Sequence, residues 1–281
     1  MLNKLNRNTS IIIVNLIFIF SPYYSFSIGK AENNHFYSKL KEVPDNVWEK
    51  LSHKTIYFAH QSVGYNIIDG IEYLIKEYPK IKLRVVESRD SASLSPGTLV
   101  HSQIGKNFDP QSKLDDFNSV IVNGFGGKVD IAGLKFCYID ISSKTKPEAL
   151  FSQYKSQIDT IRKLYPKIAI IHFTSPLTTF QSGPKAWIKK LIGRPITGLE
   201  ENIKRNEYNE LLRAEYEDKD PILDIAAIES TYPNGTRYTF VSNGKIYYSL
   251  VPDYTSDGGH LNELGRKKIA EKYLLILANL D

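Results

Sequence analysis

The stretch TIYFAHQSVGYNIIDGIEYLIKEY (55–78) decides the fold class, because a strand pattern gives way within it to a helix pattern. TIYFA (55–59) is a short run of β-forming residues, and IIDGIEYLIKEY (67–78) has apolar residues at helical spacing. IKLRVV (81–86) follows as a second apolar run of strand length. A strand, a helix and another strand in this order form the repeating unit of a parallel sheet.

The same alternation continues to the C-terminus. Asp109-Pro110 marks a helix start, with Asp as the N-cap and Pro as the first helical residue. Further helices are predicted over 147–164, 198–217 and 261–280, further strands over 129–139, 167–173 and 221–228, and a long loop over 87–107. We therefore expect one α/β domain in which a parallel sheet is covered by helices on both faces.

The composition is that of an ordinary globular protein. The chain has 281 residues, 42% of them hydrophobic and 24% charged. Its net charge of +5 comes from basic residues spread along the chain, whereas nucleic-acid binding usually needs a concentrated patch, so no nucleic-acid partner is predicted. Cys137 is the only cysteine, which excludes an internal disulfide and a cysteine-type zinc site.

The N-terminus has the pattern of a secretory signal peptide. Lys4 and Arg7 precede a nearly apolar run at 11–20, and small Ser25 and Ser27 follow at spacings typical of a cleavage site. The apolar run is short for a membrane span. We expect residues 1–30 to be a signal peptide, residues 31–281 to be a single exported domain, and membrane attachment only if the signal stays uncleaved.

Ser62 is the first candidate catalytic residue. It directly follows the first predicted strand and precedes a helix, so its Oγ would project at the carboxyl edge of the sheet. The helix N-terminus there offers N–H groups and a positive dipole end to a developing oxyanion. The alternative is that Ser62 only caps the helix, since Ser is a favoured N-cap residue.

Asp257 and His260 lie three residues apart in a Gly-rich turn that enters the last predicted helix. A histidine can take the proton of a serine hydroxyl and return it to a leaving group, and a nearby carboxylate fixes its tautomer. The alternative is that Asp257 caps the helix while His260 packs.

Together these features resemble the SGNH or GDSL-like hydrolase superfamily. A strand-end Ser early in the chain and DGGHLNELG (257–265) before the terminal helix carry the resemblance, which spans about residues 54–280. The resemblance implies a three-layer α/β/α sandwich with a mostly parallel, flavodoxin-like sheet, and hydrolysis of carboxylic esters without a metal or organic cofactor. It also implies Ser62 as nucleophile, His260 as general base and acid, and Asp257 as the partner of the histidine.

The sequence departs from the family pattern at two blocks. The usual Gly-Asp-Ser is replaced by His60-Gln61-Ser62, which keeps the nucleophile. The oxyanion glycine of the second block matches Gly105 by position, although an ordinary loop glycine fits as well. The usual Gly-x-Asn-Asp falls on CYID (137–140), which places Ile139 where the family has its oxyanion Asn. Asn107 or Tyr138 is therefore expected to replace that donor, beside the N–H of Ser62.

Other polar residues give weaker signals. His60, His101 and His172 lie near predicted strand ends or loops, but no pair has the helical spacing of a metal-ligand pair, so no metal site is predicted. Lys135, in an otherwise apolar run, either reaches the solvent or is paired internally with Asp140.

These observations predict an exported esterase with Ser-His-Asp catalysis. The expected substrate is an acylated glycan, from which the enzyme removes O-acetyl groups. Two alternatives remain at this point: an O-acyltransferase that uses the same triad, and a non-catalytic glycan-binding protein of the cell envelope. The sequence predicts no oligomeric state.

Overall fold

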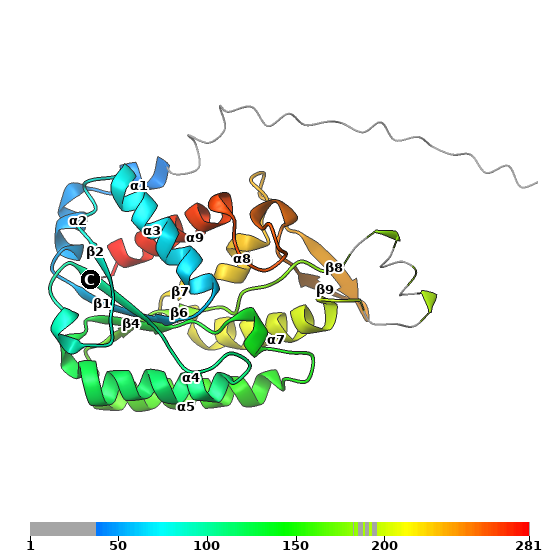
Figure 1. Ribbon diagram of the computed structural model, residues 1–281, viewed down its shortest axis with the longest axis horizontal. Coiled ribbons are helices and arrows are strands. Elements are labelled where there is room, and N and C mark those ends of the chain that lie inside the picture. The colour runs from blue at the N-terminus through cyan, green and yellow to red at the C-terminus, as the bar shows by residue number, and fades with distance from the viewer. Residues whose placement is uncertain (1–37, 182, 185–187, 189–190, 193–195, 281) are drawn as a thin grey trace, which may run out of the picture. The chain divides into compact units, whose positions relative to one another are not determined.

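The computed structural model describes residues 38–181, 183–184, 188, 191–192 and 196–280 (Figure 1). The predicted signal peptide, residues 1–30, lies outside these residues. Among the helices that are described, none combines the length and the apolar character needed to cross a membrane.

The central sheet is parallel, and its strand order matches a doubly wound fold. It contains β2 (Arg84–Glu87), β3 (Thr98–Gln103), β1 (Thr55–His60), β4 (Ile131–Leu134) and β5 (Ala169–Ile170), in that order across the sheet. A parallel pair, β6 (His172–Phe173) and β7 (Ile222–Leu223), extends it. Ile171 joins β5 to β6 and donates its N–H to the carbonyl of Ala132 at 2.9 Å.

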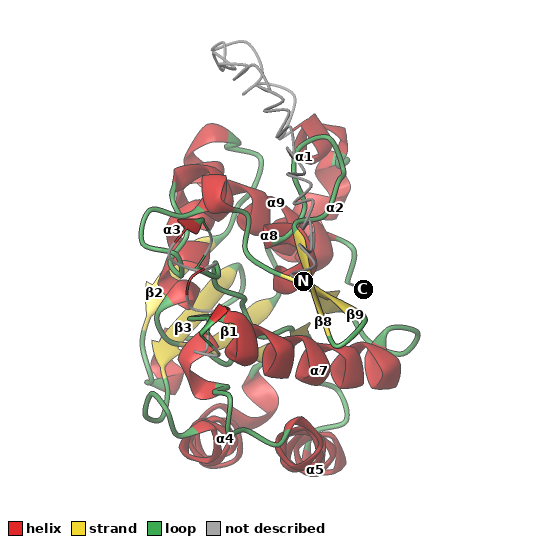
Figure 2. Cartoon of the chain, turned by 90° about the vertical axis from the view of Figure 1, so that its right-hand side faces the viewer, coloured by secondary structure: helices red, strands yellow, loops and turns green. Residues whose placement is uncertain are grey.

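Two helical layers cover the sheet (Figures 1 and 2). One layer contains α1 (Ser38–Glu42), α2 (Asp45–Leu51), α3 (Val63–Glu77), α8 (Ile225–Glu229) and α9 (Glu263–Ala278). The other contains α4 (Pro110–Ser119), α5 (Pro147–Leu164) and α7 (Leu199–Tyr216). A hydrophobic core lies between the sheet and each helical layer, and alternate residues of β1 point into one or the other. Ile56 and Phe58 pack in the core under the first layer, and Tyr57 and Ala59 pack in the core under the second. The fold is therefore the predicted three-layer α/β/α sandwich.

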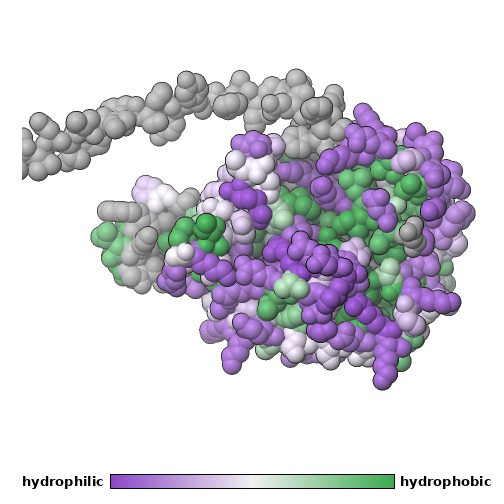
Figure 3. All heavy atoms as spheres, turned by 180° about the vertical axis from the view of Figure 1, so that it is seen from behind, coloured by the Kyte–Doolittle hydropathy of each residue, from purple (hydrophilic) through white to green (hydrophobic). Residues whose placement is uncertain are grey.

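A β-hairpin lies beside the start of α7. Strands β8 (Thr239–Ser242) and β9 (Lys245–Tyr248) pair in antiparallel fashion across a turn at residues 243–244. Phe240 and Tyr247 point inward, while Val241 and Ile246 are exposed. Seen from behind, the surface has hydrophobic areas between hydrophilic ones (Figure 3). Short helical turns complete the described structure: η2 (Ser91–Ser93), η3 (Val120–Phe125), η4 (Gly126–Lys128), η5 (Tyr138–Asp140) and η6 (Pro252–Tyr254).

Three predicted elements were wrong in detail. The expected strand 129–139 ends at Leu134, and a 3-10 turn follows at Tyr138–Asp140. The expected loop 87–107 contains β3, which pairs with both β1 and β2 near the middle of the sheet. Three of its buried residues are polar, namely Thr98, His101 and Ser102, so the apolar signal is only two residues long. The expected strand 221–228 stops after β7, because Asp224 caps α8 by accepting the N–H of Ala227.

Candidate active site

Ser62 lies between β1 and α3, at the carboxyl edge of the sheet. Its backbone has φ 52° and ψ −112°, a left-handed conformation that costs a non-glycine residue about 1–3 kcal/mol. Gly64 follows in the first turn of α3, where a Cβ would lie 2.3 Å from the ring of His60. Within the described part of the chain, the N–H of Ser62 has no hydrogen-bond partner. The backbone thus presents both the hydroxyl and a free N–H at one point.

The structure brings Ser62, His260 and Asp257 together. Ser62 Oγ lies 2.7 Å from His260 Nε2, and His260 Nδ1 lies 2.7 Å from Asp257 Oδ2. Because Nδ1 faces a carboxylate oxygen, it carries the proton and donates it to Asp257, which leaves Nε2 free to accept the proton of the hydroxyl. Residues 198 positions apart thus form one continuous hydrogen-bonded series.

Asp257 is held by its own turn. Its Oδ1 accepts the N–H groups of Gly259 at 2.9 Å and His260 at 2.8 Å. Desolvation raises the pKa of the Asp257 carboxyl, but these N–H donors and the His260 ring outweigh that effect and hold the pKa well below its usual value. The carboxylate is therefore ionised at neutral pH, as an orienting partner of a histidine must be.

Tyr138 forms a wall beside the histidine. Its ring meets that of His260 edge to face, with the centroids 5.7 Å apart. Gly259 passes so close that a Cβ there would lie 2.8 Å from the Tyr138 ring. Only glycine fits at that position without moving the tyrosine.

Gly105 lies in the loop after β3, but its N–H is engaged. It donates to Asp116 Oδ2 at 2.8 Å. The carbonyls of Ile104 and Gly105 accept the amide of Gln61, at 2.6 and 2.8 Å. Gln61, in the place of the family's Asp, therefore ties the nucleophile turn to this loop, and Gly105 does not offer a free donor in this structure.

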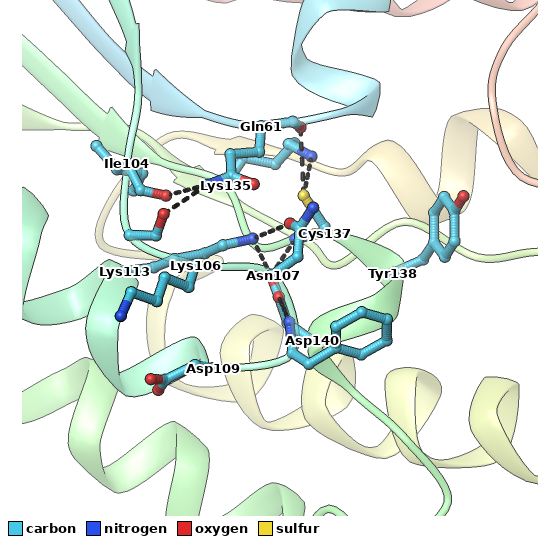
Figure 4. A network of polar contacts seen from close by, with 12 residues as sticks. Gln61, Ile104, Lys106, Asn107, Asp109, Lys113, Lys135, Cys137, Tyr138 and Asp140 are labelled. Carbon is cyan, nitrogen blue, oxygen red and sulfur yellow. Dashed lines mark hydrogen bonds and ion pairs between the residues drawn. The ribbon is translucent and has the colours of Figure 1, made fainter.

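Asn107 is anchored by a buried ion pair (Figure 4). Lys113 Nζ donates to Asp140 Oδ2 at 2.6 Å and to Asn107 Oδ1 at 3.0 Å, and the side chains of Lys113 and Asp140 are both fully buried. Asp140 also accepts the N–H groups of Cys137 and Phe108, at 2.7 and 3.1 Å. The Lys113 contact occupies the oxygen of the Asn107 amide and leaves its NH₂ group without a partner in the described residues.

Lys135 is buried, but the expected pairing with Asp140 is wrong, because Lys113 takes that place. The ammonium of Lys135 instead lies 3.7 Å from Cys137 Sγ, which in turn donates to the carbonyl of Gln61 at 3.3 Å. Burial lowers the pKa of Lys135. Lys113 could not be recognised from the sequence, because a lysine in a polar helix start is typically solvent-exposed.

The remaining histidines are buried. His60 Nε2 lies 3.0 Å from His101 Nδ1, and burial, with the charge of Lys135 nearby, lowers the pKa of His60 to about 2. His172 contacts the hydroxyl of Tyr154 at 2.7 Å. Across the residues that the structure describes, no cluster of three or more His, Cys, Asp or Glu side chains has the geometry of a metal site.

A cavity of about 730 Å³ opens next to this group. Asp257, Gly258 and Gly259 form the wall nearest the histidine. Aromatic and polar side chains form other parts of the wall, among them Phe108, Tyr138, Phe180, Thr178, Glu201 and Arg205. Its volume lies within the range of small-molecule sites, about 300–1,000 Å³.

Comparisons with known proteins bear on the fold. No family model and no curated protein matches the sequence. A candidate acylhydrolase from Bacteroides fragilis superposes with a TM-score of 0.50 at 16% identity, covering 89% of this chain and 97% of its own. A GDSL-like lipase from Bacteroides thetaiotaomicron gives a TM-score of 0.49 at 12% identity, covering 87% of this chain and 100% of its own. The periplasmic domain of a lipopolysaccharide acetyltransferase from Salmonella ser. Paratyphi A gives 0.43 at 12% identity, with coverages of 87% and 97%.

At 16% identity, the similarity to the Bacteroides fragilis protein concerns the fold and not the reaction. It agrees with the parallel sheet and the two helical layers. The chain therefore shares its overall fold with this acylhydrolase from Bacteroides fragilis.

Proposed function

We propose that the protein is a serine hydrolase of carboxylic esters, with Ser62 as nucleophile. One observation carries the proposal: Ser62 Oγ, the His260 ring and the Asp257 carboxylate form a series with both contacts at 2.7 Å. Such a series is the requirement for activating a serine hydroxyl, whose own acidity is too weak for attack at neutral pH.

In the proposed reaction, Ser62 Oγ attacks the ester carbonyl while His260 Nε2 takes its proton. The tetrahedral intermediate collapses, the C–O bond to the alcohol breaks, and His260 protonates the leaving alcohol. Water then attacks the acyl-serine with His260 again as base, which releases the acid and restores Ser62. Asp257 holds the ring and stabilises its protonated form during both steps.

The oxyanion would be bound by the N–H of Ser62 and by Asn107. The amide of Asn107 is oriented because Lys113 holds its oxygen, so its NH₂ group is the one available for a ligand. Asn107 would thus supply the side-chain donor that the family takes from the position of Ile139. One such donor contributes about 3–4 kcal/mol to transition-state stabilisation. Tyr138, packed on the His260 ring, acts in this proposal as a wall and not as a donor.

The substrate we propose is an O-acetylated carbohydrate outside the cell. The cavity beside Asp257 combines aromatic and polar side chains, as suits a sugar, whose ring has apolar faces and hydroxyl edges. Export rests on the N-terminal pattern of Lys4, Arg7 and the apolar run 11–20.

Hydrolysis of p-nitrophenyl acetate tests the reaction. We expect turnover by the wild-type protein and a loss of about a thousandfold or more in Ser62→Ala and in His260→Ala, since both belong to one catalytic unit. Circular dichroism of each variant controls for folding. Equal rates in all three proteins would remove Ser62 and His260 from the mechanism.

The same assay on an acetylated oligosaccharide separates hydrolysis from acyl transfer. A hydrolase releases free acetate in proportion to substrate consumed, whereas an acyltransferase moves the acetyl group to an added sugar acceptor. Absence of both products, with glycan binding that Ser62→Ala leaves intact, would favour the non-catalytic alternative.

A further inference from the structure

The cavity beside Asp257 contains a buried cation that no carboxylate neutralises directly. Arg205 of α7 lines the cavity and is only 4% exposed. Its Nε donates to the carbonyl of Tyr138 at 2.9 Å, and its Nη1 donates to Thr178 Oγ1 at 2.9 Å and to Asn202 Oδ1 at 2.8 Å. All three acceptors are neutral. Within the described chain no carboxylate oxygen lies within 4 Å of the guanidinium, and Nη2 donates no hydrogen bond.

This arrangement fixes the guanidinium and leaves one end of it for a ligand. Burial lowers the pKa of Arg205 to about 10, so the group stays charged at neutral pH. A buried charge without a counter-ion is costly, and an arginine is suited to carboxylate or phosphate oxygens. Nη2, the guanidinium nitrogen without a hydrogen bond, is where an anion would complete the site.

Two nearby carboxyl groups do not neutralise the charge of Arg205. Glu229 is fully buried, and burial raises its pKa to about 8, so it is largely protonated at neutral pH. Glu201 also lines the cavity, one turn before Arg205, but it is partly solvated and forms no ion pair with it. The N-terminus of α7, with Gly198 at the cavity wall, adds a positive dipole end on the same side.

We infer that this cavity binds an anionic group, a carboxylate or a phosphate, on a sugar whose acyl ester is presented to Ser62. The inference rests on the proposed function and names its substrate class, an acylated acidic sugar. Phe108, 77% exposed at the rim, and Phe180 offer aromatic faces for the sugar ring. A neutral sugar would cover Arg205 without compensating its charge.

The first test compares acidic and neutral substrates within each protein variant. We would measure kcat/KM for acetyl esters of methyl glucuronoside and of methyl glucoside, with the acetyl group at the same position. Wild type should prefer the acidic sugar by about tenfold or more, as expected for a hydrogen bond to a charged group. Arg205→Met should abolish the preference, and Arg205→Lys should retain part of it. The ratio does not depend on the fraction of folded enzyme.

Arg213→Met is the matched control, because Arg213 lies on the same helix but pairs with Asp224 and does not line the cavity. This variant should keep the wild-type preference. Equal rates for the two sugars in wild type, or the same loss of preference in Arg205→Met and Arg213→Met, would overturn the inference.

A binding experiment separates this inference from the proposed reaction. Calorimetric titration of Ser62→Ala with glucuronate, glucose 6-phosphate and glucose needs no turnover. Binding of either anionic sugar but not of glucose supports the inference and distinguishes carboxylate from phosphate, provided that Arg205→Met in the same background removes it. No binding, or equal binding of all three, overturns it. If the wild-type protein shows no hydrolysis that depends on Ser62, while anionic sugars still bind as described, only the proposed function is overturned.

Discussion

At the residue scale, the nucleophile position shows how local strain accompanies chemistry. Ser62 holds a backbone conformation that favours glycine, and the tight contact between Gly64 and His60 leaves little room for relaxation. Strain of this kind persists only where the surroundings over-determine the backbone. Here β1 fixes one side of the turn and α3 the other.

Replacement of Ser62 should therefore separate stability from activity. We expect Ser62→Gly to abolish esterase activity and to raise the free energy of unfolding by about 1 kcal/mol relative to Ser62→Ala, because glycine removes the strain and alanine keeps it. Urea unfolding of the two inactive variants measures the difference. Equal stabilities would show that the left-handed backbone is not strained.

The buried pair under Asn107 gives a second prediction at this scale. Lys113→Met leaves Asp140 as an unpaired buried carboxylate and should lower the free energy of unfolding by about 3–5 kcal/mol. Adding Asp140→Asn, which removes the charge but keeps an acceptor for Phe108 N–H, should recover much of that loss. Turnover should stay low in the double variant, because the Asn107 oxygen remains unheld. Denaturant titrations measure the stability of both variants. A double variant as unstable as Lys113→Met would contradict the ion-pair account.

At the scale of elements, α7 shows why sequence pattern reveals only part of the site. Asn202, Arg205, Asn206 and Asn209 recur at helical spacing and read as a solvent-facing stripe, yet all are buried. Their side chains form hydrogen bonds inside the protein instead: Asn209, for example, both donates to and accepts from the backbone of Ser175. Arg205 was missed for this reason, since its burial depends on contacts distant in sequence.

Other elements were predictable because their signals are local. The Asp109-Pro110 helix start is observed, with Asp109 accepting the N–H of Ser112. Strand β3 has only Leu99 and Val100 as an apolar signal, and its place beside β1 is set by long-range pairing. The proximity of Ser62 to His260 is also long-range, and only the motif resemblance anticipated it.

The crossing of α3 and α9 provides the prediction at this scale. A Cβ at Gly70 would lie 2.6 Å from the carbonyl oxygen of Arg266 and 2.8 Å from Ala270 Cβ. Gly70→Ala should therefore lower the free energy of unfolding by about 1–3 kcal/mol through overpacking. Gly124→Ala is the control, because nothing lies within 4 Å of a Cβ there. Thermal unfolding of both variants measures the effect. Equal changes in melting temperature for the two variants would contradict the close helix crossing.

At the scale of the whole molecule, buried titratable groups act on stability in opposite directions. The pKa of His60 falls from 6.5 to about 2, so only the unfolded chain takes up this proton below pH 6.5, and stability falls as the pH falls. The pKa of Glu229 rises from 4.5 to about 8, so the folded chain keeps a proton that the unfolded chain loses, and stability falls as the pH rises through this range.

Glu229→Gln isolates the second effect. Gln keeps an acceptor for the N–H of Leu177 but has no charge to gain. Between pH 5 and pH 8 we expect the wild-type free energy of unfolding to fall relative to Glu229→Gln by about 3 kcal/mol, since each pKa unit corresponds to about 1.4 kcal/mol. Urea titrations at both pH values measure this. If the difference in the free energy of unfolding between wild type and Glu229→Gln did not change with pH, Glu229 would ionise normally in the folded state.

The central claim is that Ser62 is the group acylated during turnover. Reaction of the protein with a fluorophosphonate ester, followed by peptide mass spectrometry, tests it most directly. We expect a single covalent adduct on Ser62, with labelling lost in His260→Ala and slowed in Asp257→Asn. Labelling on another residue, or hydrolysis of p-nitrophenyl acetate that continues with Ser62 fully labelled, would contradict it.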